Sequence, residues 1–379
     1  MIKVLYVIEN EFFGGGERAF SQLIRGLDRS KYSIYAAFLP GGLFEERIQG
    51  YCRLIKLDLR NRFDIFRIFA LADIIRKERI DIIHSQGARA DFFSRLASRL
   101  AGKSKAVSTV AMPVDGFDVG IFRKSVYTVL DRFTERYADR FITVSDRLKQ
   151  ELNARHKIPE NKITRVYNGI EPAEYSFDQG EGARIRKEMG LAQDVRIIGS
   201  IGRLVWQKGF IYLLRAVKYL DEQGLLAKAN ARFIIVGDGP QRKKLEAEAA
   251  ALGIAKYVLF TGFSRDVKKM LNIMDIMVFP SLKEGQPIAL LEAMAMSRPV
   301  VATDIPGVNE TLINRADGIL VRPEDPLELA LALETLLKDQ QKADAMGLAA
   351  RKAVEEKFNI RDKIQQYERI YDILTPGRV

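Results

Sequence analysis

The stretch SLKEGQPIALLE, residues 281–292, follows an apolar run at residues 276–279 that we interpret as a short buried strand. The turn Gly285-Gln286-Pro287 then opens a helix, because proline at the first helical position has its φ preset and its missing N–H has no partner there. A strand that leads straight into a helix is the repeating unit of a parallel sheet covered by helices. This stretch therefore predicts an α/β fold.

The same helix start is suited to binding an anion, since free backbone N–H groups point outward and the helix dipole favours negative charge. Glu284 precedes the helix and Glu292 lies within it. Carboxylates do not hold an anion, so we expect both to accept hydrogen bonds from hydroxyls of a ligand whose phosphates sit on the N–H groups. A nucleotide sugar combines these groups.

Strand-like apolar segments alternate with helix-length segments along the whole chain, which predicts two doubly wound parallel sheets. The turn cluster at residues 167–172 marks a boundary, so we expect one domain at 1–172 and a second from 173. Open parallel sheets bind ligands outside the carboxyl ends of their strands, so two such domains predict a site in a cleft between them. The predicted strands are residues 4–8, 33–39, 80–84, 106–110, 141–144, 164–166, 197–201, 233–236, 258–260, 276–279, 300–302 and 318–321.

The composition is that of a folded protein without a membrane-spanning segment. The chain has 379 residues, of which 47% are hydrophobic and 29% charged, and it is too long for one ordinary core. No apolar run approaches the ~20 residues that span a bilayer, and we interpret residues 1–8 as a first strand rather than a signal peptide. The single cysteine, Cys52, has no partner for an internal disulfide, which predicts a cytoplasmic protein.

The net charge of +11 lies mainly in the first half of the chain. Residues 1–172 hold 30 basic and 21 acidic side chains, whereas residues 173–379 hold 30 and 28. A basic surface with aromatic side chains can meet an anionic membrane or a polyanion. The alternative is a solvated helix face whose aromatics belong to the core. The most basic segment is residues 51–150, with 20 basic and 12 acidic side chains, and its aromatics include Phe63, Phe66, Phe69, Phe92, Phe93, Phe117, Phe122, Tyr127 and Phe133.

A glycine-rich loop follows the first predicted strand. Gly14, Gly16 and Ala19 formally match the dinucleotide fingerprint G-x-G-x-x-A. That fingerprint also needs an acidic residue at the end of the second strand, and this strand ends Phe-Leu-Pro-Gly at residues 38–41, which disfavours NAD. The glycines then either let the backbone approach a phosphate or sugar closely or form an ordinary tight turn.

A second loop, Gly-Arg-Leu-Val-Trp-Gln-Lys-Gly at residues 202–209, follows the first strand of the second domain. Arg203 and Lys208 could clamp a diphosphate, since a guanidinium grips phosphate oxygens bidentately and an ammonium acts as a point charge. Each such bond contributes ~1.5 to 3 kcal/mol. The alternative is a solvent-exposed basic pair. The position of the loop after a strand, facing the glutamate stretch, favours the clamp.

Other polar and glycine residues also follow predicted strands. Gly237 gives a sharp entry to a helix, while Thr261 and Gly262 could accept a planar base against exposed backbone. His84 ends a predicted strand and would point at the cleft, although a lone histidine there is often structural; His156 is expected at the surface. The sequence contains no D-x-D, H-E-x-x-H or Cys-His cluster, so no protein-bound metal is predicted.

Taken together, the motifs resemble the family 4 retaining glycosyltransferases. The resemblance rests on the E-x7-E element from Glu284 to Glu292, the Gly-Gly-Gly-Glu-Arg segment, the Gly-Arg-Leu…Lys-Gly loop and the Val-Gly-Asp-Gly-Pro turn. It covers nearly the whole chain and is strongest at residues 196–322. It implies the GT-B fold: an acceptor-binding Rossmann-like domain at 1–172, completed by the last helix at 358–379, and a donor-binding domain at 173–357.

The resemblance also implies a role for each matching residue. Arg203 and Lys208 would hold the donor diphosphate, Glu284 would contact the transferred sugar, and Glu292 would take the ribose hydroxyls. The mechanism implied is retaining, without metal or cofactor, and depends on electrostatic stabilisation of the departing diphosphate. The remaining donor contacts would come from Gly15, Gly16, Gly237, Thr261, Gly262, Gly285, Gln286, Pro287, Ile288 and Ala289.

The chain departs from the family pattern in two places. Ala111 stands where a histidine often ends the strand, so either His84 substitutes for it or no histidine is needed. Residues 306–310 read Pro-Gly-Val-Asn-Glu where Gly-Gly-x-x-Glu is common.

We therefore expect a glycosyltransferase that moves a sugar from a nucleoside diphosphate sugar to a lipid-linked or cell-surface glycan acceptor. It would work in the cytoplasm, with peripheral contact at the inner, anionic face of the membrane. One alternative is a nucleotide-sugar epimerase or a sugar-phosphate synthase on the same fold. Another is a non-catalytic nucleotide- or nucleic-acid-binding protein, which would lose nucleic-acid affinity steeply with salt.

Overall fold

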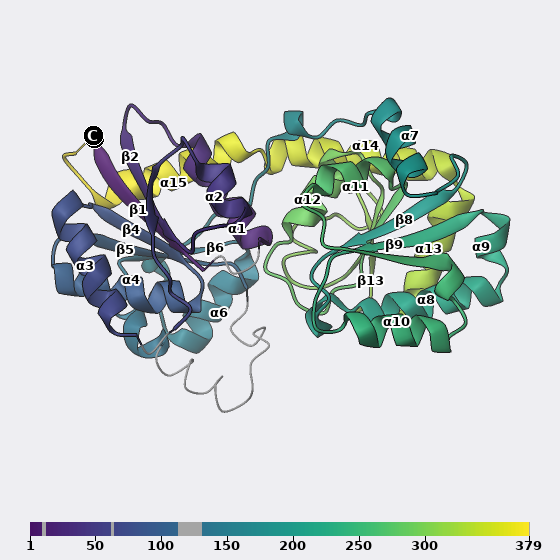
Figure 1. The fold of residues 1–379 in the computed structure, drawn as a ribbon, viewed down its shortest axis with the longest axis horizontal. Helices are drawn as coiled ribbons and strands as arrows, with labels where there is room; N and C mark the ends of the chain where they lie inside the picture. Colours follow the sequence, from purple (N-terminus) through teal and green to yellow (C-terminus); the bar gives the residue numbers. More distant parts are fainter. Residues whose placement is uncertain (10–12, 62–63, 113–130, 379) are drawn as a thin grey trace. The chain divides into compact units, whose positions relative to one another are not determined.

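A computed structural model describes residues 1–9, 13–61, 64–112 and 131–378 (Figure 1). The chain divides into two compact units. Unit 1 consists of Met1–Gly169 with Ile360–Val379, and unit 2 consists of Ile170–Asn359. The sequence predicts these divisions at residues 172 and 357. Unit 2 is thus inserted into the sequence of unit 1.

Unit 1 is built on a parallel sheet with the strand order β3-β2-β1-β4-β5-β6-β7. The chain starts in the middle of this sheet, moves out to one edge through β2 and β3, and returns to the other side of β1 at β4, as in a doubly wound sheet. The strands are β1 (Ile2–Ile8), β2 (Tyr32–Phe38), β3 (Arg53–Lys56), β4 (Ile82–Gln86), β5 (Lys105–Val110), β6 (Arg140–Thr143) and β7 (Ile163–Arg165).

Helices cover both faces of this sheet (Figure 1). Alternate residues of β1 show the two layers: Val4 and Tyr6 pack with α1 and α15, whereas Leu5 and Val7 pack with α3 and α4. A strand buried on both faces explains the continuous apolar run that opens the sequence. The helices of unit 1 are α1 (Gly15–Gly26), α2 (Leu43–Ile48), α3 (Phe66–Glu78), α4 (Ala88–Ala101), α6 (Asp146–His156) and α15 (Ile360–Leu374), with a 3-10 turn η2 (Glu160–Lys162).

Unit 2 repeats this plan with a parallel sheet in the order β10-β9-β8-β11-β12-β13. Its strands are β8 (Arg196–Ile201), β9 (Ala231–Val236), β10 (Val258–Gly262), β11 (Ile276–Phe279), β12 (Val300–Thr303) and β13 (Ile319–Val321). Its helices are α7 (Gln179–Glu188), α8 (Phe210–Glu222), α9 (Leu225–Lys228), α10 (Arg242–Ala251), α11 (Val267–Ile273), α12 (Ile288–Ala295), α13 (Pro326–Lys338) and α14 (Gln340–Lys357), with 3-10 turns η3 (Pro172–Glu174), η4 (Trp206–Lys208) and η5 (Ala255–Tyr257).

The main core of unit 2 lies between its sheet and the helices α8, α10 and α13, with α11 and α12 on the opposite face (Figure 1). Ile198 and Val278, on neighbouring strands, both point into this core. Because β8 and β11 lie side by side in the middle of the sheet, their following loops emerge together at its carboxyl edge. These are the loops of residues 202–209 and 280–287.

Each strand predicted from the sequence is present, with ends shifted by a few residues. Among the strands of the described residues, the sequence prediction misses β3, which is short and has a partly or fully exposed side chain at every position. Two shifts affect candidate site residues. β4 runs to Gln86, so His84 lies inside the strand, and β10 runs to Gly262, so Thr261 and Gly262 form the end of that strand rather than the turn after it. Pro287 is the residue before α12 rather than its first helical residue.

The aromatic side chains of the basic segment divide between surface and core. Phe66, Phe69 and Phe133 are exposed, whereas Phe93 is fully buried and Phe92 packs against the core. Phe63, Phe117, Phe122 and Tyr127 lie outside the described residues. Some aromatics of the segment therefore belong to an exposed basic surface, and others belong to the core. In the part of the chain that the structure covers, no helix is long and apolar enough to cross a bilayer.

Candidate functional site

The centre of the candidate site is an ion pair between the loops that follow β8 and β11. The Lys208 ammonium lies 2.6 Å from Oε1 of Glu284, and the Ser281 hydroxyl donates to the same oxygen at 2.8 Å. The Glu284 side chain is only 6% exposed, while that of Lys208 is 24% exposed. The structure thus brings together two residues that the sequence separates widely, at the edge where parallel sheets bind ligands.

Backbone contacts fix these two loops to each other. The N–H groups of Leu282 and Lys283 donate to the carbonyl of Gln207 at 2.7 and 3.2 Å. Gly209 has a φ of +64°, and a Cβ there would lie 1.9 Å from the carbonyl oxygen of Pro280. Only glycine allows both this conformation and this approach. The position of Lys208 beside Glu284 is therefore set by the backbone.

A similar arrangement joins the loops after β8 and β9 to the end of β10. Gly237 has a φ of +137°, and a Cβ there would lie 1.9 Å from the carbonyl oxygen of Gly202. The N–H of Gly237 donates to the carbonyl of Gly262 at 2.8 Å. The Thr261 hydroxyl is 3.5 Å from the carbonyl of Ile235. The predicted donor-binding residues Gly237, Thr261 and Gly262 thus form one connected edge.

The start of α12 is closely packed. Gly307 lies against the carbonyl of Gly285, where a Cβ would come within 1.8 Å, and its φ is +83°. Gln286 Nε2 donates to the Thr311 hydroxyl at 3.2 Å, and Thr311 donates to the carbonyl of Gly307 at 2.8 Å. The Pro-Gly-Val-Asn-Glu loop, which departs from the family pattern, thus supports the turn that opens the helix. Of the following residues Ile288 is buried and Ala289 is half-buried.

Glu292 lies in α12 and is only 1% exposed. The Tyr175 hydroxyl donates to its Oε1 at 2.7 Å. A ribose at this carboxylate would therefore share it with Tyr175, and the predicted ribose contact stays a prediction. Arg203 lies in the same loop as Lys208 and is exposed. Its predicted contact with a diphosphate is likewise a prediction.

His84 does not reach the ligand edge of unit 1, and the expectation that it points there is wrong. It is fully buried, with Nδ1 2.6 Å from the Tyr371 hydroxyl and Nε2 2.7 Å from the Thr109 hydroxyl. Burial lowers the pKa of His84 to about 3, so the ring is neutral and joins β4, β5 and α15. His84 therefore has a structural role, which is the alternative that the sequence left open for a lone histidine at a strand end. His156, expected at the surface, has a nearly buried ring that pairs with Glu135.

Position 111, where the family pattern has a histidine, directly follows β5. Ala111 therefore stands at the carboxyl edge of the unit 1 sheet, where a histidine side chain could reach a ligand. Alanine has no titratable group, and His84 lies two positions before the end of its own strand. No histidine among the described residues takes the place of the missing one.

The glycine-rich loop of unit 1 leads into α1. The Gly14 N–H donates to Oε2 of Glu17 at 2.8 Å, so a carboxylate of the chain caps this helix start. Burial, chiefly, raises the pKa of Glu17 to about 7. A Cβ on Gly16 would lie 2.3 Å from Nε2 of Gln86 at the end of β4, so the Gln86 side chain would have to move. Gly15 is exposed.

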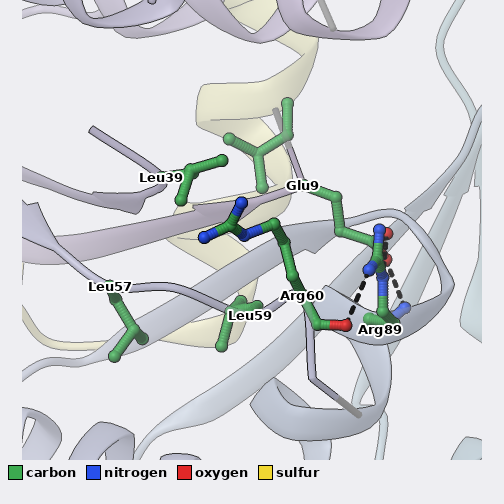
Figure 2. Close-up of a pocket in the computed structure, with 7 residues that line it drawn as sticks. Glu9, Leu39, Leu57, Leu59, Arg60 and Arg89 are labelled. Atoms are coloured by element: carbon green, nitrogen blue, oxygen red, sulfur yellow. Dashed lines mark hydrogen bonds and ion pairs between the residues drawn. The ribbon is translucent and has the colours of Figure 1, made fainter. Parts of the chain in front are cut away.

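A small pocket lies at the carboxyl edge of the unit 1 sheet (Figure 2). Glu9 caps the start of α4, since its carboxylate accepts from the Ala90 N–H at 3.1 Å and from Arg89 Nε at 2.6 Å. Arg89 also donates to the carbonyl of Arg60 at 2.9 Å. The pocket combines apolar walls with two arginines and is lined by Ile8, Glu9, Leu39, Leu57, Leu59, Arg60 and Arg89.

Sequence reasoning missed two residues of the site, Ser281 and Tyr175. Ser281 stands three positions before Glu284, a spacing that places a hydroxyl near a carboxylate in a turn. Tyr175 gives no comparable signal, because it lies 117 positions from Glu292 and only the fold joins them. Within the described residues, no three His, Cys, Asp or Glu side chains gather as a metal site would require. Metal independence stays a prediction.

Two family models match consecutive parts of the chain. Residues 182–353 match the model described as glycosyl transferases group 1, and residues 13–174 match the model described as glycosyltransferase family 4. The first match contains the Lys208–Glu284 pair and the whole carboxyl edge of the unit 2 sheet. The second contains the glycine-rich loop and the pocket residues of unit 1 from Leu39 to Arg89, but not Ile8 and Glu9.

Two curated relatives carry related sequences. An uncharacterised glycosyltransferase of Methanocaldococcus jannaschii is 34% identical over 61% of this chain and 59% of its own length, so the match spans less than two thirds of that protein. The UDP-Gal:alpha-D-GlcNAc-diphosphoundecaprenol alpha-1,3-galactosyltransferase of Escherichia coli is 28% identical over 81% of this chain and 79% of its own length.

Among solved structures, Anabaena Alr3699/HepE in complex with UDP-glucose is similar to this chain with a TM-score of 0.85. The two are 21% identical, and the match covers 98% of this chain and 100% of the other. At this identity the likeness concerns the fold. It confirms the predicted fold class, two parallel-sheet α/β domains of the GT-B type.

Proposed function

Because the chain belongs to the group 1 glycosyltransferases, with a family 4 amino-terminal part, we propose that it transfers a sugar from a nucleoside diphosphate sugar, with retention, to a lipid-linked or cell-surface glycan. The observation that carries this proposal is the Lys208–Glu284 pair at the carboxyl edge of the unit 2 sheet. A cation held beside a hydrogen-bond-accepting carboxylate suits a ligand that joins phosphates to hydroxyls.

The proposed chemical step breaks one bond, forms another and moves one proton. The bond between the anomeric carbon and the diphosphate oxygen breaks, and its electron pair leaves with the nucleoside diphosphate. The acceptor oxygen forms the new bond on the same face of the sugar, and its proton passes to an oxygen of the leaving diphosphate. Lys208 and Arg203 stabilise the charge that develops on that diphosphate. No metal is needed where fixed cations supply this stabilisation.

Other residues of unit 2 orient the donor. Glu284 accepts hydrogen bonds from hydroxyls of the transferred sugar, in the place where Ser281 already donates to it. Glu292 receives the ribose hydroxyls beside Tyr175. The connected edge at Gly237, Thr261 and Gly262 takes the base, and the backbone from Gly285 to Ala289 meets sugar and phosphate. For Gly15 and Gly16 of unit 1, the predicted contact with the diphosphate stays a prediction.

We assign the acceptor to unit 1. Its segment 1–172 carries nine more basic than acidic side chains, 30 against 21, which suits an acceptor with phosphates. The Escherichia coli relative is named for an acceptor on diphosphoundecaprenol. A lipid-linked acceptor implies work in the cytoplasm with peripheral contact at the inner face of the membrane.

A thermal-shift screen of nucleoside diphosphates and their sugars tests the donor assignment, because a ligand of the native state raises its Tm. The donor found in this way is then incubated with a lipid-linked glycan, and proton NMR reads the anomeric configuration of the first product. We expect the configuration of the donor and an unchanged rate in EDTA. An inverted product overturns retention, and epimerised donor in the absence of acceptor identifies an epimerase instead.

Sedimentation with vesicles tests the membrane contact. The protein should sediment with anionic vesicles at low salt and less with neutral ones, since exposed charges attract over about 10 Å at 0.1 M salt. A protein that stays in the supernatant and glycosylates a soluble acceptor efficiently contradicts the membrane assignment.

A further inference from the structure

Trp206 is the only tryptophan of the chain, and it lies in the η4 turn two positions before Lys208. Its side chain is 36% exposed, whereas both of its neighbours in the chain, Val205 and Gln207, are buried. A large aromatic group thus faces solvent in the loop that supplies the ammonium of the site. The donor contacts and the chemical step of the proposed transfer do not use it.

The indole ring contacts Lys283, the residue directly before Glu284. The ammonium of Lys283 lies 5.3 Å from the centre of the Trp206 ring. The N–H of Lys283 donates to the carbonyl of Gln207 at 3.2 Å, so the two loops are also joined at the backbone here. A cation over an aromatic face is attracted by the ring's electron density. These contacts join the turn that carries Trp206 to the loop that carries Glu284.

The surroundings of the ring indicate what it can bind. Pockets for small molecules combine aromatic surface with a few polar groups that set orientation. Here the aromatic surface is Trp206, and the polar groups are the carboxylate of Glu284 and the ammonium groups of Lys208 and Lys283. A pyranose ring matches this set, because its C–H groups form an apolar face while its hydroxyls point outward from the rim.

We propose that Trp206 is a platform on which a pyranose ring stacks while its hydroxyls bond to Glu284. The proposal rests on the proposed function, which places a transferred sugar at Glu284. The nucleotide base has its own place at the edge formed by Gly237, Thr261 and Gly262. The ring is therefore either the sugar of the donor or the sugar of the acceptor, and one set of variants distinguishes the two.

Two substitutions separate stacking from packing. Trp206→Ala removes the aromatic face, whereas Trp206→Phe keeps a smaller one. Phe177→Ala is a matched control: Phe177 is 56% exposed and lies 4.7 Å from the guanidinium carbon of Arg298, but Arg298 precedes the amino end of β12, away from the site. All three proteins are first checked by thermal unfolding, where we expect Tm values close to that of the wild type.

The measurements are the Kd for UDP and for UDP-glucose, or for the nucleotide pair that the thermal-shift screen selects, and the KM for donor and acceptor. We expect Trp206→Ala to raise one KM by about tenfold and Trp206→Phe by less, in line with the strength of aromatic contacts. A weaker Kd for the nucleotide sugar with an unchanged Kd for the diphosphate assigns the ring to the donor sugar. Unchanged donor constants with a raised acceptor KM assign it to the acceptor sugar.

The tryptophan emission of the wild type gives a second readout, since all of it comes from Trp206. The emission should change when the sugar that stacks on it binds, and the Phe177→Ala protein should show the same change. Equal KM values for wild type and Trp206→Ala overturn the platform. That result differs from a failure of the proposed function, in which the wild type itself binds no nucleotide sugar and transfers nothing.

Discussion

The Lys208 ammonium and the Glu284 carboxylate lie 2.6 Å apart, joining the loops of two central strands. We expect Lys208→Ala and Glu284→Ala each to lower kcat by roughly a hundredfold or more, because each removes a fixed group that stabilises charge or orients the sugar. Steady-state kinetics with the donor from the thermal-shift screen measures this. Circular dichroism should show both variants folded.

A second lysine–glutamate pair of unit 2 provides the control. Lys338 and Glu334 form an ion pair within α13, so Lys338→Ala removes a similar pair without touching the site. Its kcat should equal that of the wild type, since an exposed pair contributes about 0–1 kcal/mol to stability. Near-normal turnover of both Lys208→Ala and Glu284→Ala would remove the basis of the site assignment.

Gly209 should be intolerant of a side chain because of its neighbour, Pro280. Gly209→Ala places a Cβ 1.9 Å from the Pro280 carbonyl oxygen at a φ of +64°. We expect it to lower the free energy of unfolding by more than about 2 kcal/mol, since a positive φ alone costs roughly 1–2 kcal/mol for alanine. It should also lower kcat, because the loop that carries Lys208 has to move. Urea denaturation and kinetics measure the two effects.

Gly224 separates the effect of φ from that of the close approach. It has a φ of +66°, yet nothing lies within 4 Å of the position that a Cβ would take there. Gly224→Ala should therefore cost about 1 kcal/mol and leave kcat unchanged. Equal losses of stability in both variants would show that the contact with Pro280 is unimportant.

Tyr175 should affect nucleotide binding through Glu292. Its hydroxyl donates to Oε1 of Glu292 at 2.7 Å, and removing one hydrogen bond to a charged group costs about 1.5–3 kcal/mol. We expect Glu292→Gln to weaken the binding of the nucleoside diphosphate by at least about tenfold and Tyr175→Phe to weaken it less. Isothermal titration calorimetry measures both. If neither variant changes the Kd, Glu292 has no part in ribose binding and serves only to hold Tyr175.

His84 should make stability depend on pH. Its pKa is lowered from 6.5 to about 3 in the folded state by burial, so below pH 6.5 the unfolded chain binds a proton that the folded chain does not. The contribution of the neutral ring is complete above pH 6.5 and is lost as the pH falls towards 3. Between pH 7 and 5 the stability difference between wild type and His84→Asn should shrink by about 2 kcal/mol.

Chemical denaturation at several pH values measures this difference, in which the titration of every other group cancels. Parallel stability curves for the two proteins would show that the His84 ring is charged or accessible in the folded state. The same variant tests whether His84 is purely structural, because a buried histidine leaves the pH profile of kcat unchanged.

Strong patterns within short stretches made most of the fold predictable. β1 and β11 are buried on both faces and therefore appear as continuous apolar runs. β3 has exposed Arg53 and Lys56 at its ends and no buried position. It forms a strand because it pairs with β2 at the edge of the sheet. Local sequence carries no sign of such a partner.

In the candidate site, too, local patterns predict some residues correctly, while contacts between distant parts of the chain escape prediction. The distinctive spacing of Glu284 and Glu292 and the loop with Lys208 mark unit 2 as the donor side without a structure. The prediction for His84 fails because the extent of β4 decides whether its side chain reaches the edge, and a shift of two residues is enough to bury it. Tyr371, which bonds to His84, comes from a helix 287 positions away, a contact that no local pattern predicts.

The helix α15 has a consequence for how the chain folds. The hydroxyls of Tyr6 and Tyr371 lie 2.7 Å apart across 365 positions of sequence, and α15 supplies Ile364, Tyr367 and Tyr371 to the core of the amino-terminal sheet. During synthesis the first strands emerge early, but their core stays open until the ribosome has passed residue 371. Unit 2, which is continuous in sequence, can fold meanwhile. The unit made first is thus completed last, when α15 joins its sheet.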